Sequence, residues 1–486
     1  MARDYRRVYP RGMGRTALLV AGLVLAGCTA EPPSPEDDPS PPASSPSPTS
    51  PSPSTGGAPP VATAESFRIL VTHHHSPLRV LSVDGAVRLL GSGSLAGLRL
   101  VTDRSDVPSA ERGPDAAAVL ERVRRDPSLI GYVPVSAVDE TVRAVRVGSV
   151  DPLRDPAAYP LRSESAPPDA DIVTLTITGD IMLGRRVGAR LRDVGGPTTV
   201  FRPFLKRLAA ADITVGNLES TLSQRGVPTQ GGDSFGADPN VREALRAAGF
   251  DVIGLANNHL GDYGTAAMRD TFRLLREGHL PYVGAGRNRE EAERALVVER
   301  GGTSVGFLAV DSIGETPAAT ATSPGTSRLD MPPRTGPMDE ERLDRLEQQV
   351  RTLAGQVDTV IVMTHWGTQY TNVPEPSQRR VARTLAKAGA DVVVGGHPHW
   401  LQGLEQVGDT LVVHSLGNFV FDMDFQRRTR EGAILELVLW DGAVKGARLV
   451  PYVIGDDFTP RPVGSGPAER VLSTAWETSR GPYALP

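Results

Sequence analysis

The chain has 486 residues, with 52 lysines and arginines against 57 aspartates and glutamates, and a formal net charge of −5. This acidic balance argues against a nucleic-acid-binding protein, because such proteins carry an excess of basic side chains. Its hydrophobic content of 39% is ordinary for globular domains, and its single cysteine excludes both an intrachain disulfide and a metal site built from several thiolates.

The first segment has the pattern of a secretory signal. Several arginines precede the apolar run ALLVAGLVLA, which is too short to span a bilayer as a mature helix. The run ends just before Cys28, after Leu25-Ala26-Gly27, and this resembles the lipobox of bacterial lipoproteins. We therefore expect residues 1–27 to be a lipoprotein signal peptide and Cys28 to carry lipid that anchors the protein at the extracytoplasmic face of the cell membrane. The alternative is an unmodified cysteine in a transmembrane anchor.

Proline and serine dominate residues 28–62, which contain little that could be buried, so we expect a disordered, extended tether. A small α/β domain of unknown role is expected at 63–165. Within it, FRILVT and GLRLVT have the composition of strands, and AAAVLERVRRD has the pattern of a helix. A joint rich in proline and serine then leads to the next domain, which we expect at 171–457.

In this larger domain apolar strands alternate with amphipathic helices. The helix expected at 339–355, for example, places four apolar side chains on one stripe: Leu343, Leu346, Val350 and Leu353. Such alternation predicts sheets covered by helices, with functional side chains gathered at the carboxyl ends of the strands. Several strands do end in polar clusters, namely Gly179-Asp180, Asn217-Leu218-Glu219, Asn257-Asn258-His259, Thr364-His365, His397-Pro398-His399 and His414-Ser415.

The clusters contain side chains that can bind a metal: Asp180, Glu219, Asn258, His259, His365, His397 and His399. Carboxylate, amide and imidazole donors without a thiolate suit Mn, Fe or Zn. Five of the nine histidines stand at strand ends in this domain, and this concentration indicates a metal site. We expect His397 and His399, at i and i+2 of an extended loop, to face one side, and Gly395-Gly396 to let the backbone turn closely past an ion.

Seven motifs, in this order, resemble the CapA family of capsule or poly-γ-glutamate synthesis proteins, which belongs to the calcineurin-like metallophosphatase superfamily. The resemblance covers most of residues 171–425. The motifs are GDIMLGR (179–185), NLES (217–220), ANNHLGDYG (256–264), VGAG (283–286), HWGTQY (365–370), GGHPHWLQGLE (395–405) and SLGNFVFD (415–422).

The resemblance implies a four-layer α/β/β/α sandwich at 171–457 with one or two divalent metal ions at the sheet edge, and it implies a general acid, His259. The implied metal ligands are Asp180, Glu219, Asn258, His365, His397 and His399. We further expect Asp262 to orient His259. Arg185 is either a partner for an anionic substrate group or a surface charge. Residues 458–486 are expected to form a C-terminal tail.

Two departures from the phosphoesterases of the superfamily leave the number of metal ions open. Met182 stands where they have a histidine, and Glu219 replaces their bridging aspartate. Two hypotheses follow for a protein of capsule or poly-γ-glutamate-like polymer biosynthesis. The first is a metal-dependent hydrolase acting on an envelope polymer or phosphoester, which the retained His259 favours. The second is a non-catalytic export or anchoring factor with a structural metal site, which the family's association with polyglutamate favours.

Overall fold

The structure is a computed structural model that describes residues 67–107, 109–161, 167, 169–193, 196 and 198–486. The expected signal peptide 1–27, the expected lipid attachment at Cys28 and the expected tether 28–62 lie outside the described residues. Among the helices that are described, none is long and apolar enough to cross a membrane.

The first large sheet is mixed and has eight strands. Strands β14, β13, β10 and β9 run parallel, β23 pairs with β9, and a long hairpin of β24 and β25 adds to the other side of β9. The hairpin turns at Asp441-Gly442, a dipeptide typical of tight hairpin turns, with φ angles of 48° and 81°. The strands are β9 (Ile172–Ile181), β10 (Ile213–Leu218), β13 (Val252–Gly254), β14 (Tyr282–Val283), β23 (Asn418–Val420), β24 (Glu431–Trp440), β25 (Ala443–Ile454) and β26 (Pro460–Pro462).

The second large sheet has six strands in the order β16-β17-β19-β20-β22-β21. Its four central strands run parallel, and the two edge strands run antiparallel to their neighbours. The strands are β16 (Leu296–Arg300), β17 (Thr303–Asp311), β19 (Thr359–His365), β20 (Val392–Gly396), β21 (Leu401–Val407) and β22 (Thr410–Leu416).

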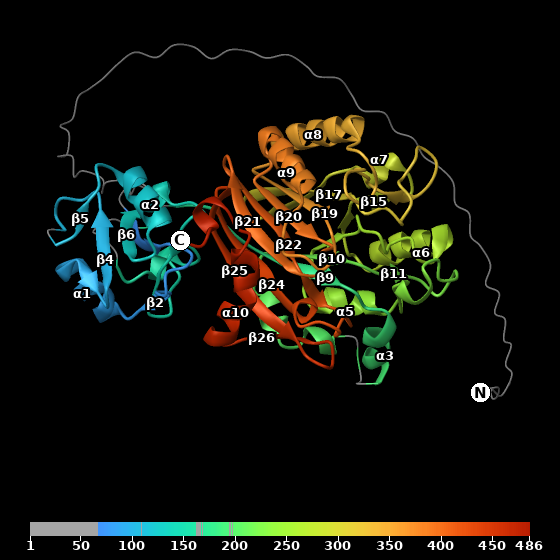
Figure 1. Ribbon diagram of the computed structural model, residues 1–486, viewed down its shortest axis with the longest axis horizontal. Coiled ribbons are helices and arrows are strands. Elements are labelled where there is room, and N and C mark those ends of the chain that lie inside the picture. Colours follow the sequence, from blue (N-terminus) through green and yellow to red (C-terminus); the bar gives the residue numbers. More distant parts are fainter. Residues whose placement is uncertain (1–66, 108, 162–166, 168, 194–195, 197) are drawn as a thin grey trace, which may run out of the picture. The chain divides into compact units, whose positions relative to one another are not determined.

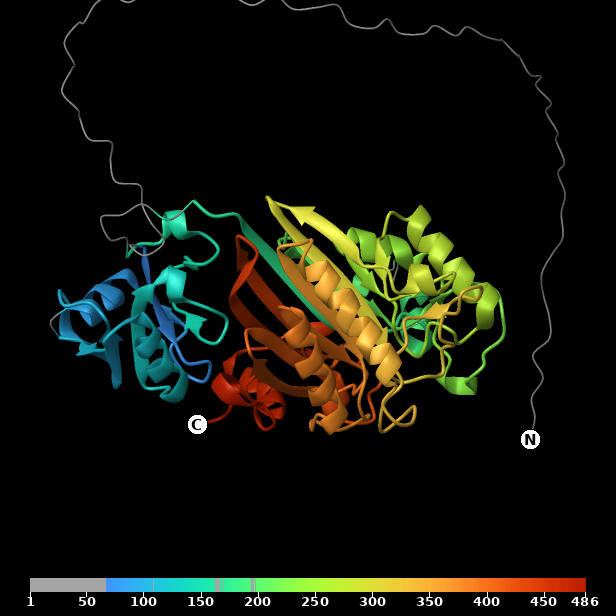
Figure 2. The ribbon, with the colours of Figure 1, turned by 90° about the horizontal axis from the view of Figure 1, so that it is seen from above.

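The two sheets pack face to face through one apolar cluster. Ile177 and Val215 of the first sheet share this cluster with Phe307 and Val394 of the second. Other apolar clusters join the outer face of each sheet to helices, so the order is helices, sheet, sheet, helices (Figures 1 and 2). The structure therefore confirms a mixed α/β fold with several sheets. The helices are α3 (Arg185–Asp193), α4 (Leu205–Leu208), α5 (Val241–Ala247) and α6 (Gly264–Glu277) on the first sheet, and α8 (Glu340–Ala354) and α9 (Pro376–Ala388) on the second.

Helix α8 has both features that make a helix predictable from sequence, an amino-terminal cap and a regular apolar stripe. Asp339 caps the amino end by accepting a hydrogen bond of 3.1 Å from the backbone N–H of Arg342. Two glutamates in the first turn oppose the positive end of the helix dipole. The apolar stripe predicted from the sequence is buried as a unit: Leu343, Leu346, Val350 and Leu353. The helix therefore follows from its period and its cap together.

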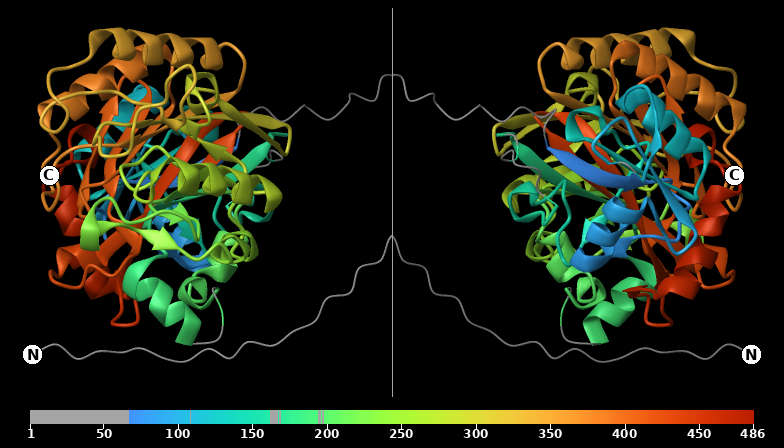
Figure 3. Two further views of the ribbon diagram at one scale, coloured as in Figure 1. Left: turned by 90° about the vertical axis from the view of Figure 1, so that its right-hand side faces the viewer. Right: turned by 90° about the vertical axis from the view of Figure 1, so that its left-hand side faces the viewer.

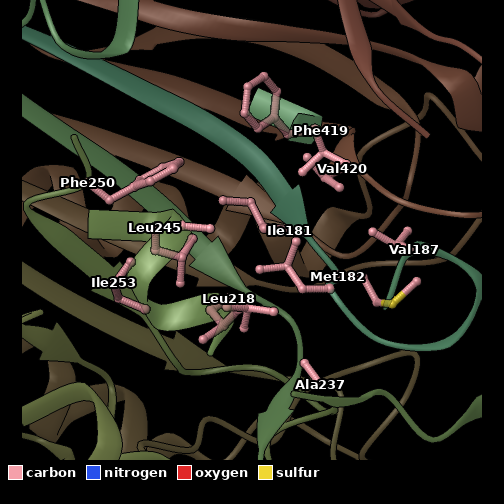
Figure 4. Packing of buried hydrophobic residues seen from close by; sticks show 14 of the residues in the cluster. Ile181, Met182, Val187, Leu218, Ala237, Leu245, Phe250, Ile253, Phe419 and Val420 are labelled. Carbon is pink, nitrogen blue, oxygen red and sulfur yellow. The ribbon is translucent and has the colours of Figure 1, made fainter. Parts of the chain in front are cut away.

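The apolar cluster outside the first sheet lies directly beside the strand ends that carry the polar residues (Figure 4). Ile181 follows Asp180 and Leu218 precedes Glu219, and both apolar side chains are fully buried. Burying such a side chain contributes about 1.5–3 kcal/mol. Met182 is fully buried in the same cluster. Packing of these apolar side chains therefore fixes the backbone at the strand ends that carry the carboxylates of Asp180 and Glu219.

Residues 67–161 form a smaller α/β body with its own six-stranded sheet, in the order β3-β4-β6-β1-β7 with β5 beside β4 (Figure 3, blue and cyan). The strands and the helix expected from FRILVT, GLRLVT and AAAVLERVRRD are present. Separate folding of 63–165 stays a prediction. The elements are β1 (Arg68–Thr72), α1 (Val83–Ser92), β3 (Ser94–Leu95), β4 (Leu98–Thr102), β5 (Glu111–Arg112), α2 (Ala116–Arg125), β6 (Leu129–Pro134) and β7 (Arg143–Ala144), followed by β8 (Arg146–Val147), which pairs with β2 (Val80–Leu81).

The smaller body and the hairpin of the first large sheet share apolar contacts, and both belong to one compact unit, 60–486. Val438 and Trp440 of β24 are part of the apolar cluster of the smaller body. The indole N–H of Trp440 also donates a hydrogen bond of 2.8 Å to the carbonyl of Leu153. Near the carboxyl end of the chain, helix α10 (Ser465–Trp476) packs on β21 and β25, and Tyr483 is fully buried.

Candidate metal centre

The predicted ligands stand at the carboxyl ends of parallel strands in both sheets. Asp180 is the second-last residue of β9 and Glu219 follows β10, whereas His365 ends β19 and the His-Pro-His motif follows β20. Carboxyl ends of parallel strands meet at one edge of a sheet, and the face-to-face packing brings the two edges together. The side chains therefore gather from segments far apart in the sequence, as the alternation of strands and helices predicts.

Two groups of side chains could each hold a metal ion. Glu219, His365 and His397 form one group, and Asp180, Glu219 and His399 form the other. Within each group the potential ligand atoms all lie within 4.8 Å of one another, and all five residues are buried. Glu219 belongs to both groups. The arrangement thus offers two neighbouring positions joined by one shared carboxylate.

The centre contains buried polar atoms that have no hydrogen-bond partner within the described residues. They are both carboxylate oxygens of Glu219, both ring nitrogens of His397 and Nε2 of His399. Leaving such atoms unpaired in the interior costs about 1–3 kcal/mol each, and native proteins pair nearly all of them. Oxygen and imidazole donors are the ligands that Mn, Fe and Zn accept. The side chains therefore fit a divalent metal.

The protonation of the centre also suits a cation. Burial raises the pKa of Glu219 to about 8, and burial together with the charge of Glu219 raises the pKa of Asp180 to about 6. Burial lowers the pKa of His399 to about 3 and that of His397 well below its usual range, so both rings stay neutral. Neutral imidazole is the form that binds a metal, and a cation would favour both ionised carboxylates.

Neighbouring amides orient the ligands. Asn217 donates a hydrogen bond of 2.7 Å to Oδ1 of Asp180, and the backbone N–H of His397 donates one of 3.0 Å to Oδ2. Nδ1 of His399 donates to Oδ1 of Asn418 at 2.8 Å, which leaves Nε2 for a metal. Sequence reasoning missed both asparagines. The signal was present, because each stands in a quoted motif beside a strand end.

The backbone of the His-Pro-His motif differs from the extended loop that we predicted. His397 has φ 93° and His399 has φ 58°, so the alternation of side chains along an extended chain does not apply. The two imidazoles instead belong to different groups of the centre. The glycine before them is required for another reason, since a Cβ on Gly396 would lie 2.4 Å from Oδ1 of Asp180.

His259 stands beside the centre with its ring held in place. Its Nδ1 donates a hydrogen bond of 2.8 Å to Asp262, which also accepts from the backbone of Phe235 and the side chain of Gln230, each at 2.6 Å. The Phe235 ring stacks on the imidazole with centroids 3.6 Å apart. Burial lowers the pKa of His259, but the bond to Asp262 and the charge of Glu219 outweigh burial, so the pKa is raised. The ring therefore tends to carry a second proton, on Nε2, which lies 3.7 Å from Oε1 of Glu219.

Arg185 has partners within the protein. Its guanidinium pairs with the buried carboxylate of Asp422 and lies 3.4 Å from Asp233. The guanidinium also lies 4.4 Å from the centroid of the Phe235 ring, which stacks on the imidazole of His259. Arg185 is thus tied to the surroundings of the centre, and an anionic substrate group would have to share it with two carboxylates.

Asn258 is held by a loop glutamate that sequence reasoning missed. Its Oδ1 lies 2.9 Å from Nε2 of His365, and its Nδ2 donates a hydrogen bond of 2.6 Å to Glu315. Arg334 donates to the other oxygen of Glu315 at 2.8 Å. This chain of contacts fixes which end of the amide faces the centre. No periodicity or motif marks Glu315 in the sequence.

We expect Glu315→Ala to weaken metal binding by about 10–100-fold, the usual effect of removing a side chain that orients a ligand. Without Glu315 the amide of Asn258 can turn its nitrogen toward the centre. Competition titration with a metal-binding dye measures the change. Glu341→Ala, which removes an exposed glutamate paired with Arg345 on α8, is the matched control. Equal affinities in the two variants would show that Glu315 does not position the ligand.

A helix-covered pair of sheets with a buried carboxylate and imidazole centre at its strand ends places the molecule in the metallophosphatase-like class. The chain belongs to the bacterial capsule synthesis protein PGA_cap family, whose model matches residues 174–423.

Three relatives illustrate the similarity. The chain is 33% identical over 318 residues to the capsule biosynthesis protein CapA of Bacillus anthracis. This alignment covers 64% of this chain and 75% of that protein. It is 31% identical over 297 residues to the PGA biosynthesis protein CapA of Bacillus subtilis. This alignment covers 60% of this chain and 74% of that protein. A probable polyglutamine synthesis accessory protein of Mycobacterium tuberculosis is 27% identical to this chain over 292 residues. This alignment covers 52% of this chain and 76% of that protein.

Proposed function

We propose that this chain is a metal-dependent hydrolase of capsule or poly-γ-glutamate-like polymer biosynthesis, acting on an envelope polymer or phosphoester. The names of its relatives support the polymer. The pair formed by His259 and Asp262 supports hydrolysis more than any other observation, because it places a proton donor 3.7 Å from the carboxylate that both metal-binding groups share. A buried imidazole oriented by a carboxylate beside such a centre is the arrangement that general acid catalysis requires.

In this proposal Asp180, Glu219, Asn258, His365, His397 and His399 hold one or two divalent ions. A metal there supplies Lewis-acid stabilisation of the negative charge that develops on the substrate. His259 acts through Nε2, since Nδ1 is bound to Asp262. The protonated imidazole donates its Nε2 proton to the leaving group, and Asp262 stabilises the positive charge of the ring before the transfer.

The second hypothesis is a non-catalytic factor of polymer export or anchoring whose metal holds the two sheets together. The deep burial of the centre favours it, because Asp180, Glu219, His397 and His399 have no exposed surface. Such burial suits a structural ion and hinders a large substrate.

One experiment separates the hypotheses. The full chain, purified without chelator and offered Mn, Fe and Zn, is analysed for metal and then assayed against a panel of phosphoesters and poly-γ-glutamate. Bound metal with hydrolysis of any panel member supports the hydrolase. Bound metal with no hydrolysis of any of them favours the structural role, and a protein that binds none of the three metals contradicts both.

We also propose that the protein is lipid-anchored at the extracytoplasmic face of the cell membrane through Cys28. Cys28→Ser should shift the protein from the membrane fraction to the soluble fraction or leave its signal uncleaved, because stable anchoring needs acyl chains. Fractionation and mass spectrometry of the mature amino terminus measure this. Ser45→Ala in the expected tether is the control. An amino terminus that starts elsewhere and carries no lipid would exclude the anchor.

A further inference from the structure

A pocket lies where the smaller body meets the β24–β25 hairpin, and its charged lining residues are mostly basic. Five arginines line it, namely Arg79, Arg143, Arg146, Arg154 and Arg448, together with two acids, Asp151 and Glu436. None of its lining residues belongs to the metal centre. A pocket with five guanidinium groups and two carboxylates carries a net charge of 5 − 2 = +3.

The two acids do not neutralise these arginines individually. Glu436 is buried and pairs with Arg154 and Arg448, and also with Arg207 from outside the pocket, so three guanidinium groups share one negative charge. In the described part of the chain, no carboxylate lies within 4.0 Å of the guanidinium groups of Arg79, Arg143 and Arg146. Three positively charged residues therefore line one pocket without a paired anion.

Arg143 is held in place by neutral partners. Its guanidinium donates hydrogen bonds of 2.7 Å to the carbonyls of His74, Ser76 and Leu78. Burial and the charges of Arg79 and Arg448 lower the pKa of Arg143 to about 9. Carbonyl oxygens fix the group without compensating its charge, and an uncompensated charge that is partly buried destabilises a protein. The fold therefore maintains a positive charge that only an external anion would balance.

We propose that this pocket binds an oxyanion that carries two or more negative charges, from phosphate or carboxylate groups. Guanidinium groups form paired hydrogen bonds with both kinds of group, and several arginines around one space favour a multivalent anion over chloride. Val142, Leu153 and Val438 supply an apolar wall that fits a carbon backbone between charged groups. The site is independent of the proposed hydrolysis and of the metal.

The test is calorimetric titration of the full chain with pyrophosphate, citrate and, as a monovalent control, chloride, at constant ionic strength. At least one of the two multivalent anions should bind with a stoichiometry of one, and the better binder identifies the group that is recognised. Arg79→Ala with Arg146→Ala should weaken this binding at least tenfold. The side chains of Arg79 and Arg146 make no hydrogen bond or ion pair within the described residues, so their removal should not destabilise the fold. The exposed Arg351, paired with Glu347 on α8, provides the control Arg351→Ala.

Two further variants make the result decisive. His397→Ala should retain the full anion affinity, which separates this pocket from any phosphate bound at the metal centre. If the double variant fails to fold, Arg79→Ala alone should still weaken binding several-fold, because Arg79 is an exposed residue of the pocket lining. The proposal is overturned if neither multivalent anion binds more tightly than chloride, or if the arginine variants bind as tightly as the wild type.

Discussion

His397→Ala and His399→Ala should each lower metal affinity by more than the roughly 10–100-fold that is usual for loss of an orienting side chain, because each removes a ligand itself. The two histidines belong to different groups, so each variant should lose a different ion if the protein binds two. Glu219→Gln should weaken both positions, since Glu219 is common to them. Metal analysis after dialysis against a defined free-metal buffer measures these effects.

His279→Asn is the matched control for these variants. His279 is exposed, and asparagine tolerates its φ of 52° better than alanine would. The control should bind as much metal as the wild type. If His397→Ala and His399→Ala also keep the wild-type metal content, the metal in this protein is bound elsewhere, and the assignment of the His-Pro-His motif is wrong.

Unlike His397→Ala and His399→Ala, the His259→Ala variant should retain its metal. Its turnover should fall by about 10²–10⁴-fold, the range for general acid catalysis. Its Nδ1 is bound to Asp262, and it belongs to neither metal-binding group. Asp262→Asn should reduce turnover less, because it leaves the imidazole present but removes the charge that raises its pKa. Metal content and the rate on the best substrate of the panel, followed against pH, give both quantities.

The sign of the pH effect is a further check on His259. The wild-type rate should fall as pH rises through the raised pKa of His259, because the protonated ring is the donor. The His259→Ala variant should lose this alkaline fall. A variant that keeps both its rate and its pH profile would show that His259 takes no part in proton transfer and would favour the structural hypothesis.

Much of the fold could be predicted because local pattern and tertiary packing agree. The stripe of Leu343, Leu346 and Val350 is the face that α8 buries, and the turn between β24 and β25 falls at Asp441-Gly442, a dipeptide typical of hairpin turns. The candidate metal ligands could be predicted by a similar logic, since strand ends collect polar side chains. Each of these residues stands in a short polar motif at the end of a strand, and the parallel sheets bring the motifs together.

The remaining features depend on geometry that residue types do not encode. The positive φ angles of His397 and His399 arise from the packing of their loop, so a rule for extended chains failed. His414 has the same chemistry as the ligands, yet it lies within β22 and pairs with Glu405. Partnerships across long distances in sequence, such as that of Arg185 with Asp422, leave no local signal.

The position of Phe235 has a consequence for the proton transfer that we propose for His259. Its ring lies flat on His259, and its backbone N–H holds the same carboxylate that holds the imidazole. The imidazole is thus fixed both at its face and at one edge, so it has almost no freedom to rotate. Its orientation is set once, when the chain folds, and no ordering entropy opposes proton transfer at each turnover. Preorganisation of this kind predicts that Phe235→Ala would slow the reaction although the phenyl ring takes no part in the chemistry.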